Sequence, residues 1–103
     1  MYGTIGRLRI KPGMEDEFKQ ILQSQATAFE SGQVEGFVAS YVYHMNADPN
    51  EYNIAAVFEN REAYWTNARK SEQDARYRQW LPLLDGEPEW HDGVIDVTYK
   101  LQR

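Results

Sequence analysis

The chain opens with an alternating pattern of side chains and then changes to a helical repeat. Residues 2–10 alternate between two faces, which predicts a strand because successive strand side chains point to opposite sides. Residues 11–13, Lys-Pro-Gly, interrupt this alternation. Residues 14–29 then place apolar side chains at three- and four-residue intervals, with acidic residues in the first turn, where they suit the helix dipole. This part of the chain therefore predicts a strand followed by a helix.

Two further strands follow, joined by a short turn. Residues 37–45 are rich in β-branched and aromatic side chains, and residues 52–58 are largely apolar, which favours a strand in each. The intervening residues 46–51 contain Asp-Pro-Asn, a typical turn sequence. We expect the two strands to pair as an antiparallel hairpin.

The second helical region is predicted in two parts. Asn60 stands where an N-cap is expected for a helix that begins near residue 61. Residues 71–74, Ser-Glu-Gln-Asp, form a second capping pattern, so we expect the helix to break and restart there. Pro82 should end or kink the second part near Trp80, because proline lacks an amide hydrogen and clashes with the preceding turn.

The end of the chain predicts a final strand. Residues 85–93 are interpreted as a loop with some extended character, and residues 94–101 alternate as a strand does. The resulting order, β-α-β-β-α-β, is that of the ferredoxin-like plait, an α+β fold in which both helices cover one face of an antiparallel sheet. The chain shows no linker or repeat, and its 103 residues are interpreted as a single domain, 1–103.

Both faces of the predicted sheet are partly apolar, which bears on assembly. The two sides of residues 37–44 would carry Phe37, Ala39, Tyr41 and Tyr43 on one and Val38, Ser40, Val42 and His44 on the other. In a monomer, the face without helices should be polar. We therefore expect a homodimer packed sheet on sheet, which buries some of Val38, Ser40 and Val42 or their cross-strand neighbours.

Composition narrows the range of partners. The net charge is −5 and the isoelectric point about 4.9, which argues against binding to a nucleic-acid backbone. There are no cysteines, so a disulfide framework, a thiolate nucleophile and a cysteine-ligated zinc site are excluded. The sequence contains no apolar stretch typical of a signal peptide or a membrane span. We therefore interpret the protein as cytoplasmic, without a membrane partner.

Three segments resemble the antibiotic-biosynthesis-monooxygenase family of the dimeric α/β-barrel superfamily. They are LRIKPGMEDEF after the first strand, EGFVASYVYH in the second and AAVFENREAYW before the second helix; the later EPEWHDG is similar to closing loops of uncharacterised members. The resemblance covers nearly the whole chain and implies a dimeric α/β barrel. Characterised members include cofactor-free oxygenases of quinol-like polyketides, a haem-degrading branch and proteins that modify quinol signals. The resemblance thus implies a monooxygenase of a small aromatic or quinol-like substrate that uses no cofactor.

The haem-degrading branch can be compared with this chain residue by residue. That branch uses an Asn in the first strand, a Trp in the second helix and a haem-ligating His after it. The Lys-Pro-Gly turn aligns the Asn position with Gly6, and residues 58–64 align the Trp position with Asn67 and the His position with Tyr77 or Arg78. All three residues are therefore absent, and we expect no tight haem binding through a proximal His.

The two histidines each admit two interpretations. His44, at the end of a predicted strand, has a side chain suited to act as a base, or it is a surface or interface histidine. His91 lies beside Asp92 in a predicted loop, and adjacent residues seldom face each other as an oriented pair. The spacing of histidines and carboxylates indicates no metal site, because three convergent ligands are needed.

The aromatic residues around the second helical region also admit two interpretations, as core or as a pocket wall. Trp65, Tyr77 and Trp80 follow helical spacing, which is typical of a core. Several Tyr and Trp side chains together are harder to bury fully, because each polar tip needs a partner. Gly6 and Ala39, small residues in the strands, would leave room beside them. We expect some of these aromatics to form core and a subset to wall a cleft for a flat aromatic molecule.

The chemistry implied by the resemblance needs a dry pocket, a hydrogen-bonding group for the substrate oxygen and a base. The candidate catalytic residues are His44, Tyr41 and Asn67, and the candidate substrate-binding residues are Trp65, Asn53, Tyr77 and Trp80. Arg76 or Arg78 is a candidate partner for an anionic substrate. The alternative function is a catalytically silent homodimer of the same fold that binds a small ligand or serves in a stress response.

Overall fold

The computed structural model describes residues 1–102 and contains four strands, three α-helices and one short 3₁₀ helix. The elements, in chain order, are β1 (Tyr2–Arg9), α1 (Glu15–Glu30), β2 (Phe37–His44), β3 (Glu51–Phe58), α2 (Arg61–Ala68), α3 (Ser71–Trp80), the 3₁₀ helix η1 (Leu81–Leu83) and β4 (Glu89–Val94). The predicted order of strands and helices, and the division of the second helical region, are confirmed.

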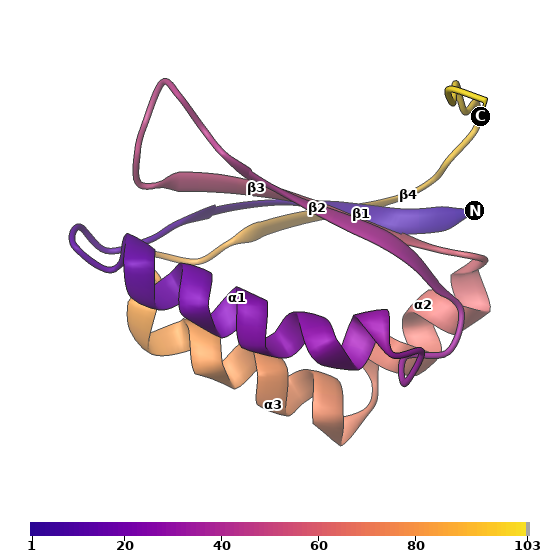
Figure 1. Cartoon of the computed structure of the whole chain (residues 1–103), viewed down its shortest axis with the longest axis horizontal. Helices are drawn as coiled ribbons and strands as arrows, with labels where there is room; N and C mark the ends of the chain where they lie inside the picture. The colour runs from indigo at the N-terminus through magenta and orange to yellow at the C-terminus, as the bar shows by residue number, and fades with distance from the viewer. Residues whose placement is uncertain (103) are drawn as a thin grey trace.

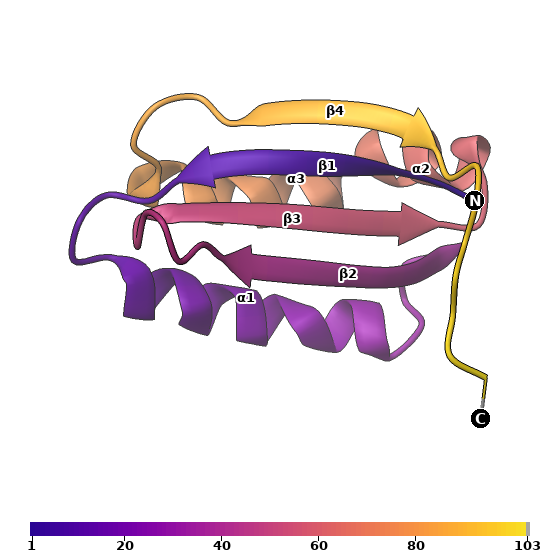
Figure 2. The ribbon, with the colours of Figure 1, turned by 90° about the horizontal axis from the view of Figure 1, so that it is seen from above.

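The strands form one antiparallel sheet in the order β2-β3-β1-β4, and all three helices cover the same face (Figures 1 and 2). This is the predicted α+β ferredoxin-like arrangement. We call the face toward the helices the inner face and the opposite one the outer face. The pairing Thr4–Ala56 and Thr4–Asp92 places one inner-face row across β3, β1 and β4. Its three residues, Thr4, Ala56 and Asp92, line the candidate site.

The division between α2 and α3 follows from local chemistry. The Asn60 side chain accepts a hydrogen bond from the backbone N–H of Ala63 at 2.8 Å, which caps the first turn of α2 as predicted. Lys70 has an extended backbone, with ψ of 144°, and separates α2 from α3. At the other end of α3, Pro82 lies in the 3₁₀ helix that follows Trp80.

The core occupies one end of the space between sheet and helices. We call this region the packed end; it consists of Leu8, Ile10, Phe18, Tyr52, Ile54, Leu83 and Leu84. Phe18 of α1 is fully buried, and its ring packs edge-on against those of Tyr52 and Trp80 at centroid distances of 5.1 and 5.6 Å. These contacts join α1, α3 and the sheet.

The predicted position of the last strand is wrong. Strand β4 spans Glu89–Val94, inside the segment interpreted as a loop, and it pairs with β1 from Arg7 to Tyr2. Residues 95–102 form no strand in this chain, although their side chains alternate. The reason is that Tyr2, at the start of β1, pairs with Val94, so the chain beyond Ile95 has no neighbouring strand in the sheet. It leaves the domain as an extended tail (Figures 1 and 2).

The prediction for the outer face of β2 is also wrong in its choice of residues. A register shift between Phe37 and Ala39 marks a β-bulge. Ser40 and Val42 then pair with Ala56 and Ile54, which belong to the inner face. The outer face instead carries Ala39, Tyr41, Tyr43, Ala55, Val57 and Ile5. Its apolar residues Tyr41, Tyr43 and Ile5 are 58–64% exposed, and the polar residues Arg7 and Asn53 lie in the same row as Tyr43.

Candidate functional site

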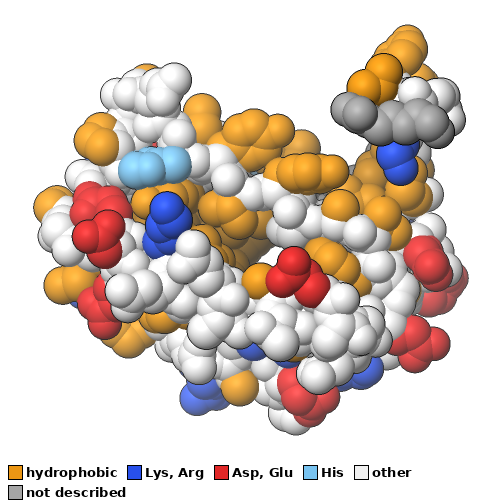
Figure 3. Space-filling view, viewed as in Figure 1, with side chains coloured by type: hydrophobic (Ala, Val, Ile, Leu, Met, Phe, Trp, Pro, Cys, Tyr) orange, Lys and Arg blue, Asp and Glu red, His pale blue; other side chains and the backbone are white. Residues whose placement is uncertain are grey.

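The candidate site is a cavity of about 900 Å³ between the sheet and the helices. It adjoins the packed end and is bordered by residues of all four strands and of α1, α2 and α3. Figure 3 shows the hollow between the two layers, with hydrophobic side chains inside it. The cavity exists because small side chains stand where the packed end has large ones; they are Thr4, Ala26, Ser40, Ala56 and Ala68.

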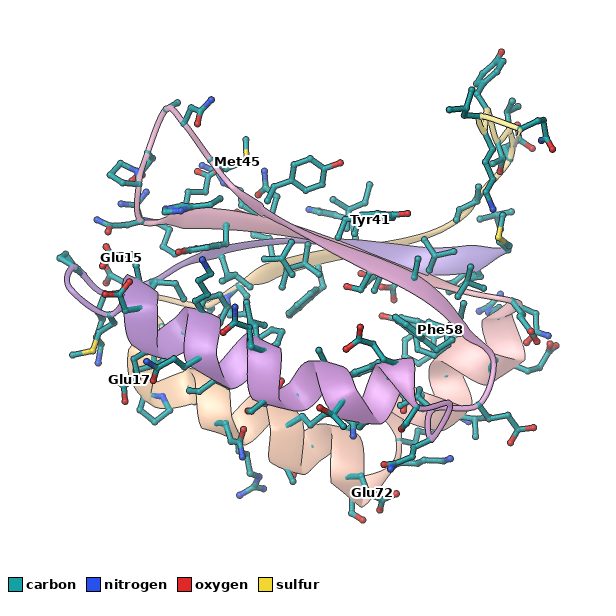
Figure 4. The ribbon with its side chains drawn as sticks, viewed as in Figure 1. Glu15, Glu17, Tyr41, Met45, Phe58 and Glu72 are labelled. Carbon is teal, nitrogen blue, oxygen red and sulfur yellow. The ribbon has the colours of Figure 1, made fainter. Side chains whose placement is uncertain are left out.

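Aromatic side chains lie on several sides of the cavity wall. All three tryptophans of the chain line it, namely Trp65, Trp80 and Trp90. Phe58 points from β3 into the space between the layers (Figure 4), where its ring contacts that of Tyr64 at 5.6 Å. Such a wall suits a flat aromatic molecule, because ring faces and edges on several sides can pack against it.

Gly6 allows one of these tryptophans to approach the sheet. A Cβ atom at Gly6 would lie 2.2 Å from the ring of Trp90, which is closer than any real contact. The group that approaches Gly6 is the side chain opposite it on β4. Any larger residue at this position would displace Trp90 from the cavity wall.

One polar group of the cavity joins α2 to β4. The Tyr64 hydroxyl donates a hydrogen bond to Oδ1 of Asp92 at 2.9 Å, and both residues line the cavity. Burial, and then the hydrogen bond to Asp92, raise the pKa of Tyr64 to about 12. Tyr64 is consequently neutral at physiological pH and is a fixed hydrogen-bond donor. The second carboxylate oxygen of Asp92 has no hydrogen-bond partner among residues 1–102.

A second polar group joins α2 to α3. Asn67 is only 8% exposed, and its Nδ2 donates to Oε1 of Gln73 at 3.2 Å. The same oxygen accepts hydrogen bonds from Nε and Nη2 of Arg76 at 3.2 and 3.0 Å. The Arg76 guanidinium lies 4.8 Å from the centre of the Phe29 ring, a distance typical of a cation–π contact. Gln73 therefore fixes both Asn67 and Arg76 at the cavity.

Gln25 of α1 satisfies the polar tip of one tryptophan. Its Oε1 accepts from the indole N–H of Trp80 at 3.1 Å, and its Nε2 donates to the Arg76 carbonyl oxygen at 3.0 Å. The Trp80 ring, held between Gln25 and Phe18, faces both the core and the cavity. Trp80 is thus both a core residue and a residue of the cavity wall, the two interpretations that the sequence leaves open for these aromatics.

The structure brings together the side chains of four of the seven candidate residues and separates the other three. Trp65, Asn67, Tyr77 and Trp80 line the cavity. Tyr41 also borders it, but its strand partner Ala55 belongs to the outer face and its side chain is 59% exposed. We infer that Tyr41 borders the cavity through its backbone; Figure 4 labels it on the side of the sheet away from the helices.

His44 and Asn53 lie outside the cavity. Nε2 of His44 is 2.6 Å from the carbonyl oxygen of Pro49, and its ring stacks on that of Tyr52 at 4.4 Å. Asn53, on the outer face, donates from Nδ2 to Sδ of Met45 at 3.2 Å. Its Oδ1 is buried without a hydrogen-bond partner in residues 1–102. The hairpin therefore uses His44 locally, and neither residue reaches a ligand in the cavity.

The remaining titratable residues do not form a metal site. No group of three His, Asp or Glu side chains in residues 1–102 is placed to hold a metal ion. His91 lies near Glu89, with its Nε2 3.9 Å from Oε2 of the carboxylate, and both are exposed.

None of the helices in residues 1–102 is long and apolar enough to cross a membrane.

Comparison with known proteins assigns the chain to a family. The sequence profile described as antibiotic biosynthesis monooxygenase matches residues 1–80. The chain belongs to this family. No curated protein matched it. The resemblance found in the sequence is thereby confirmed at the level of the family.

Solved structures with the same fold include proteins of the antibiotic biosynthesis monooxygenase family. SnoaB, a cofactor-independent oxygenase from Streptomyces nogalater, superposes with a TM-score of 0.80 at 18% identity over 94% of each chain. A candidate antibiotic biosynthesis monooxygenase from Chloroflexus aurantiacus gives 0.76 at 23% identity over 98% of each chain. A conserved protein from Methanosarcina mazei gives 0.77 at 17% identity over 89% of each chain. At these identities, the likeness establishes a common fold.

Proposed function

We propose that the protein binds a small aromatic, quinol-like substrate in this cavity and oxygenates it with molecular oxygen. The observation that supports the proposal is a hollow of about 900 Å³, walled by all three tryptophans, in a chain of a monooxygenase family. Cavities of this size hold small organic molecules. Trp65, Tyr77 and Trp80 are the side chains proposed to pack against the substrate rings.

In this proposal, the substrate supplies the electrons. Loss of a hydroxyl proton to the base gives an electron-rich anion, which passes one electron to oxygen. The substrate radical and superoxide then combine at a ring carbon that bears hydrogen, and the peroxide anion so formed takes the proton back from the base. The resulting hydroperoxide loses water and leaves a carbonyl group on the substrate. The protein holds the ring, excludes water and accepts the first proton. These tasks need hydrogen-bonding groups inside an otherwise apolar cavity.

Asn67 and the Tyr64–Asp92 pair supply these groups. Asn67 is oriented by Gln73, and its Oδ1 accepts no hydrogen bond from residues 1–102, so that oxygen can accept one from a substrate hydroxyl. Tyr64 holds one oxygen of Asp92, whose side chain is exposed at the cavity wall. In our proposal, the other oxygen takes the hydroxyl proton. His44, which lies outside the cavity, has no part in this scheme.

Oxygen consumption tests the proposal. Purified protein is incubated with a panel of hydroquinones and naphthohydroquinones, and oxygen uptake is compared with that of protein-free solution. We expect protein-dependent uptake that falls on the order of 100-fold in Asp92→Asn, the size typical of losing a general base. Asp96→Asn, a change of the same type in the exposed tail, should leave uptake unchanged. Saturable binding without any uptake would instead support the silent ligand-binding protein.

We also propose that two copies pack through their outer faces. The supporting observation is the exposed apolar row of Ile5, Tyr41 and Tyr43, which a monomer would leave in water. The exposed tail adds Val97, Tyr99 and Leu101 to the apolar surface that a second copy would cover. A two-fold interface of this kind is self-complementary, since the same row meets itself.

Sedimentation at micromolar concentration tests this assembly. We expect a dimer for the native chain and a folded monomer for Tyr43→Lys, because the added charge would be buried at the interface. Lys19→Glu, a charge change on an exposed position of α1, is the control and should remain dimeric. A native chain that sediments as a monomer would overturn the proposed assembly.

A further inference from the structure

Arg76 is the one feature of the cavity that an uncharged aromatic substrate leaves unexplained. It is half-buried and lines the cavity, yet no carboxylate of residues 1–102 forms a salt bridge with it. Burial lowers the pKa of its guanidinium, which remains charged at any physiological pH. A charge in such a place normally has a partner, because desolvating it is unfavourable.

The neighbours of Arg76 fix its position without neutralising its charge. Two of its N–H groups donate to the neutral Oε1 of Gln73, and the guanidinium carbon lies over the Phe29 ring. A guanidinium has five N–H groups, and the other three have no hydrogen-bond partner among residues 1–102. The group is therefore held in place, charged and free to bind.

Arg78, on the same helix, shows the contrasting arrangement. Its Nε lies 2.7 Å from Oδ2 of Asp74, one turn earlier, and its side chain is 73% exposed. It does not line the cavity. Of the two arginines that the sequence leaves open as anion partners, only Arg76 combines an open set of donors with access to the cavity.

The acidic residues of the cavity wall do not take the place of a ligand. Asp92 is held by Tyr64, and Asp74 is paired with Arg78. Glu30 lies at the wall with an exposed side chain and forms no salt bridge with Arg76. Glu72, one turn before Arg76 on α3, acts on this charge through space but forms no salt bridge with it and does not line the cavity. The positive charge of Arg76 thus faces a cavity whose other polar groups are engaged or suited to a hydroxyl.

We propose that the natural ligand of this cavity is an aromatic molecule that carries a carboxylate, and that Arg76 binds this carboxylate. The inference rests on the proposed function, since it takes the cavity to be the ligand site. A guanidinium binds a carboxylate through two parallel hydrogen bonds, which fixes orientation as well as affinity. Bound at Arg76, the carboxylate would set which edge of the ring faces Asn67, its neighbour through Gln73.

A matched pair of ligands tests this assignment separately from catalysis. 1-Naphthol and 1-hydroxy-2-naphthoate differ only in the carboxylate, and binding of each is followed by quenching of tryptophan fluorescence. All three tryptophans line the cavity, so the signal reports this site. We expect the naphthoate to bind about 10- to 100-fold more tightly, the range that a charged hydrogen bond contributes.

Variants assign the preference to one side chain. Arg76→Gln should abolish the preference for the naphthoate while naphthol still binds, and Arg78→Gln should retain it. Gln73→Glu, which places a carboxylate beside Arg76, should also abolish it while keeping the packing of α3. Urea unfolding of each variant verifies that the fold persists.

Two outcomes overturn the inference and differ in what they imply. Equal affinities for both ligands in the native chain, or a preference that survives in Arg76→Gln, would show that Arg76 serves only structure, with the proposed oxygenation untouched. Binding of neither ligand would remove the cavity as an aromatic site and would overturn the proposed function as well.

Discussion

The two ends of the space between sheet and helices are built from the same elements but have different contents. At the packed end, Tyr52 of β3 and Leu8 of β1 meet Phe18 of α1 and leave no room. At the open end, Ala56 of β3 and Ala26 of α1 leave a cavity of about 900 Å³. The small residues Thr4, Ala26 and Ala56 lie at the open end, while Leu8, Phe18 and Tyr52 of the same three elements fill the packed end. The fold is stabilised at the packed end, and this frees the open end to bind a ligand.

The largest expected effect lies at the packed end. Phe18→Ala should lower the free energy of unfolding by about 3–5 kcal/mol, because it removes a fully buried ring that joins two helices to the sheet. Naphthol affinity per folded molecule should fall by less than about tenfold, because Phe18 supports Trp80 but does not itself line the cavity. Urea unfolding and fluorescence titration measure the two quantities. If Phe18→Ala lowered the free energy of unfolding by less than a typical surface substitution does, the two ends would not differ as described.

Filling the open end should have the opposite effect. Ala26→Leu adds a branched side chain to the cavity wall and should lower naphthol affinity at least about tenfold. Its stability should change by less than about 1.5 kcal/mol, because the cavity has room for the added volume. Ala75→Leu, at an exposed position of α3 outside the cavity wall, is the control for added bulk in ligand binding. Unchanged affinity in Ala26→Leu would mean that the ligand binds elsewhere.

The Tyr64–Asp92 pair should make a smaller contribution that depends on pH. Because the folded-state pKa of Tyr64 is raised from 10.0 to about 12, the neutral form stabilises the fold fully below pH 10. This stabilisation is lost as the pH rises from 10 to 12. Tyr64→Phe should cost up to about 1 kcal/mol at pH 7 and lack this part of the alkaline loss. Urea midpoints of both proteins at pH 8, 10 and 11 provide the comparison; parallel curves would contradict it.

The smallest effect is expected at His44. His44→Gln should change neither naphthol affinity nor oxygen uptake beyond about twofold, because the ring contacts Pro49 and Tyr52 and not the cavity. The same titration and oxygen electrode measure both. A loss of uptake greater than tenfold with the fold intact would return His44 to the site and require a different substrate position.

Local patterns explain why much of the fold could be predicted from the sequence. Phe18 lies on a face repeated every three to four residues, and Asn60 caps a helix with its own side chain, so neither depends on distant parts of the chain. The last strand depends on where β1 ends. Alternation continues through residues 95–101, but Tyr2 already pairs with Val94 and offers no further partner.

The site was harder to predict because several of its contacts depend on how strands distant in the sequence pair. Trp65, Asn67, Tyr77 and Trp80 lie on or beside helices whose spacing is visible in the sequence. The partnership of Tyr64 with Asp92 depends on the register of β4, which the sequence places in a loop. The inward position of Val42 depends on a β-bulge that reverses the expected faces of β2. Asp92 can be identified only once the pairing of β4 with β1 is known, because this pairing places it opposite Thr4.

Trp65→Ala provides the most direct test of the central claim that the open end binds a ligand. The side chain lines the cavity and is already partly exposed, so its loss should lower stability by less than the roughly 3–5 kcal/mol of a buried aromatic. Naphthol affinity, measured by calorimetry beside urea unfolding, should fall at least about tenfold while the fold persists. A large loss of stability with unchanged affinity would contradict the account and make Trp65 part of the core.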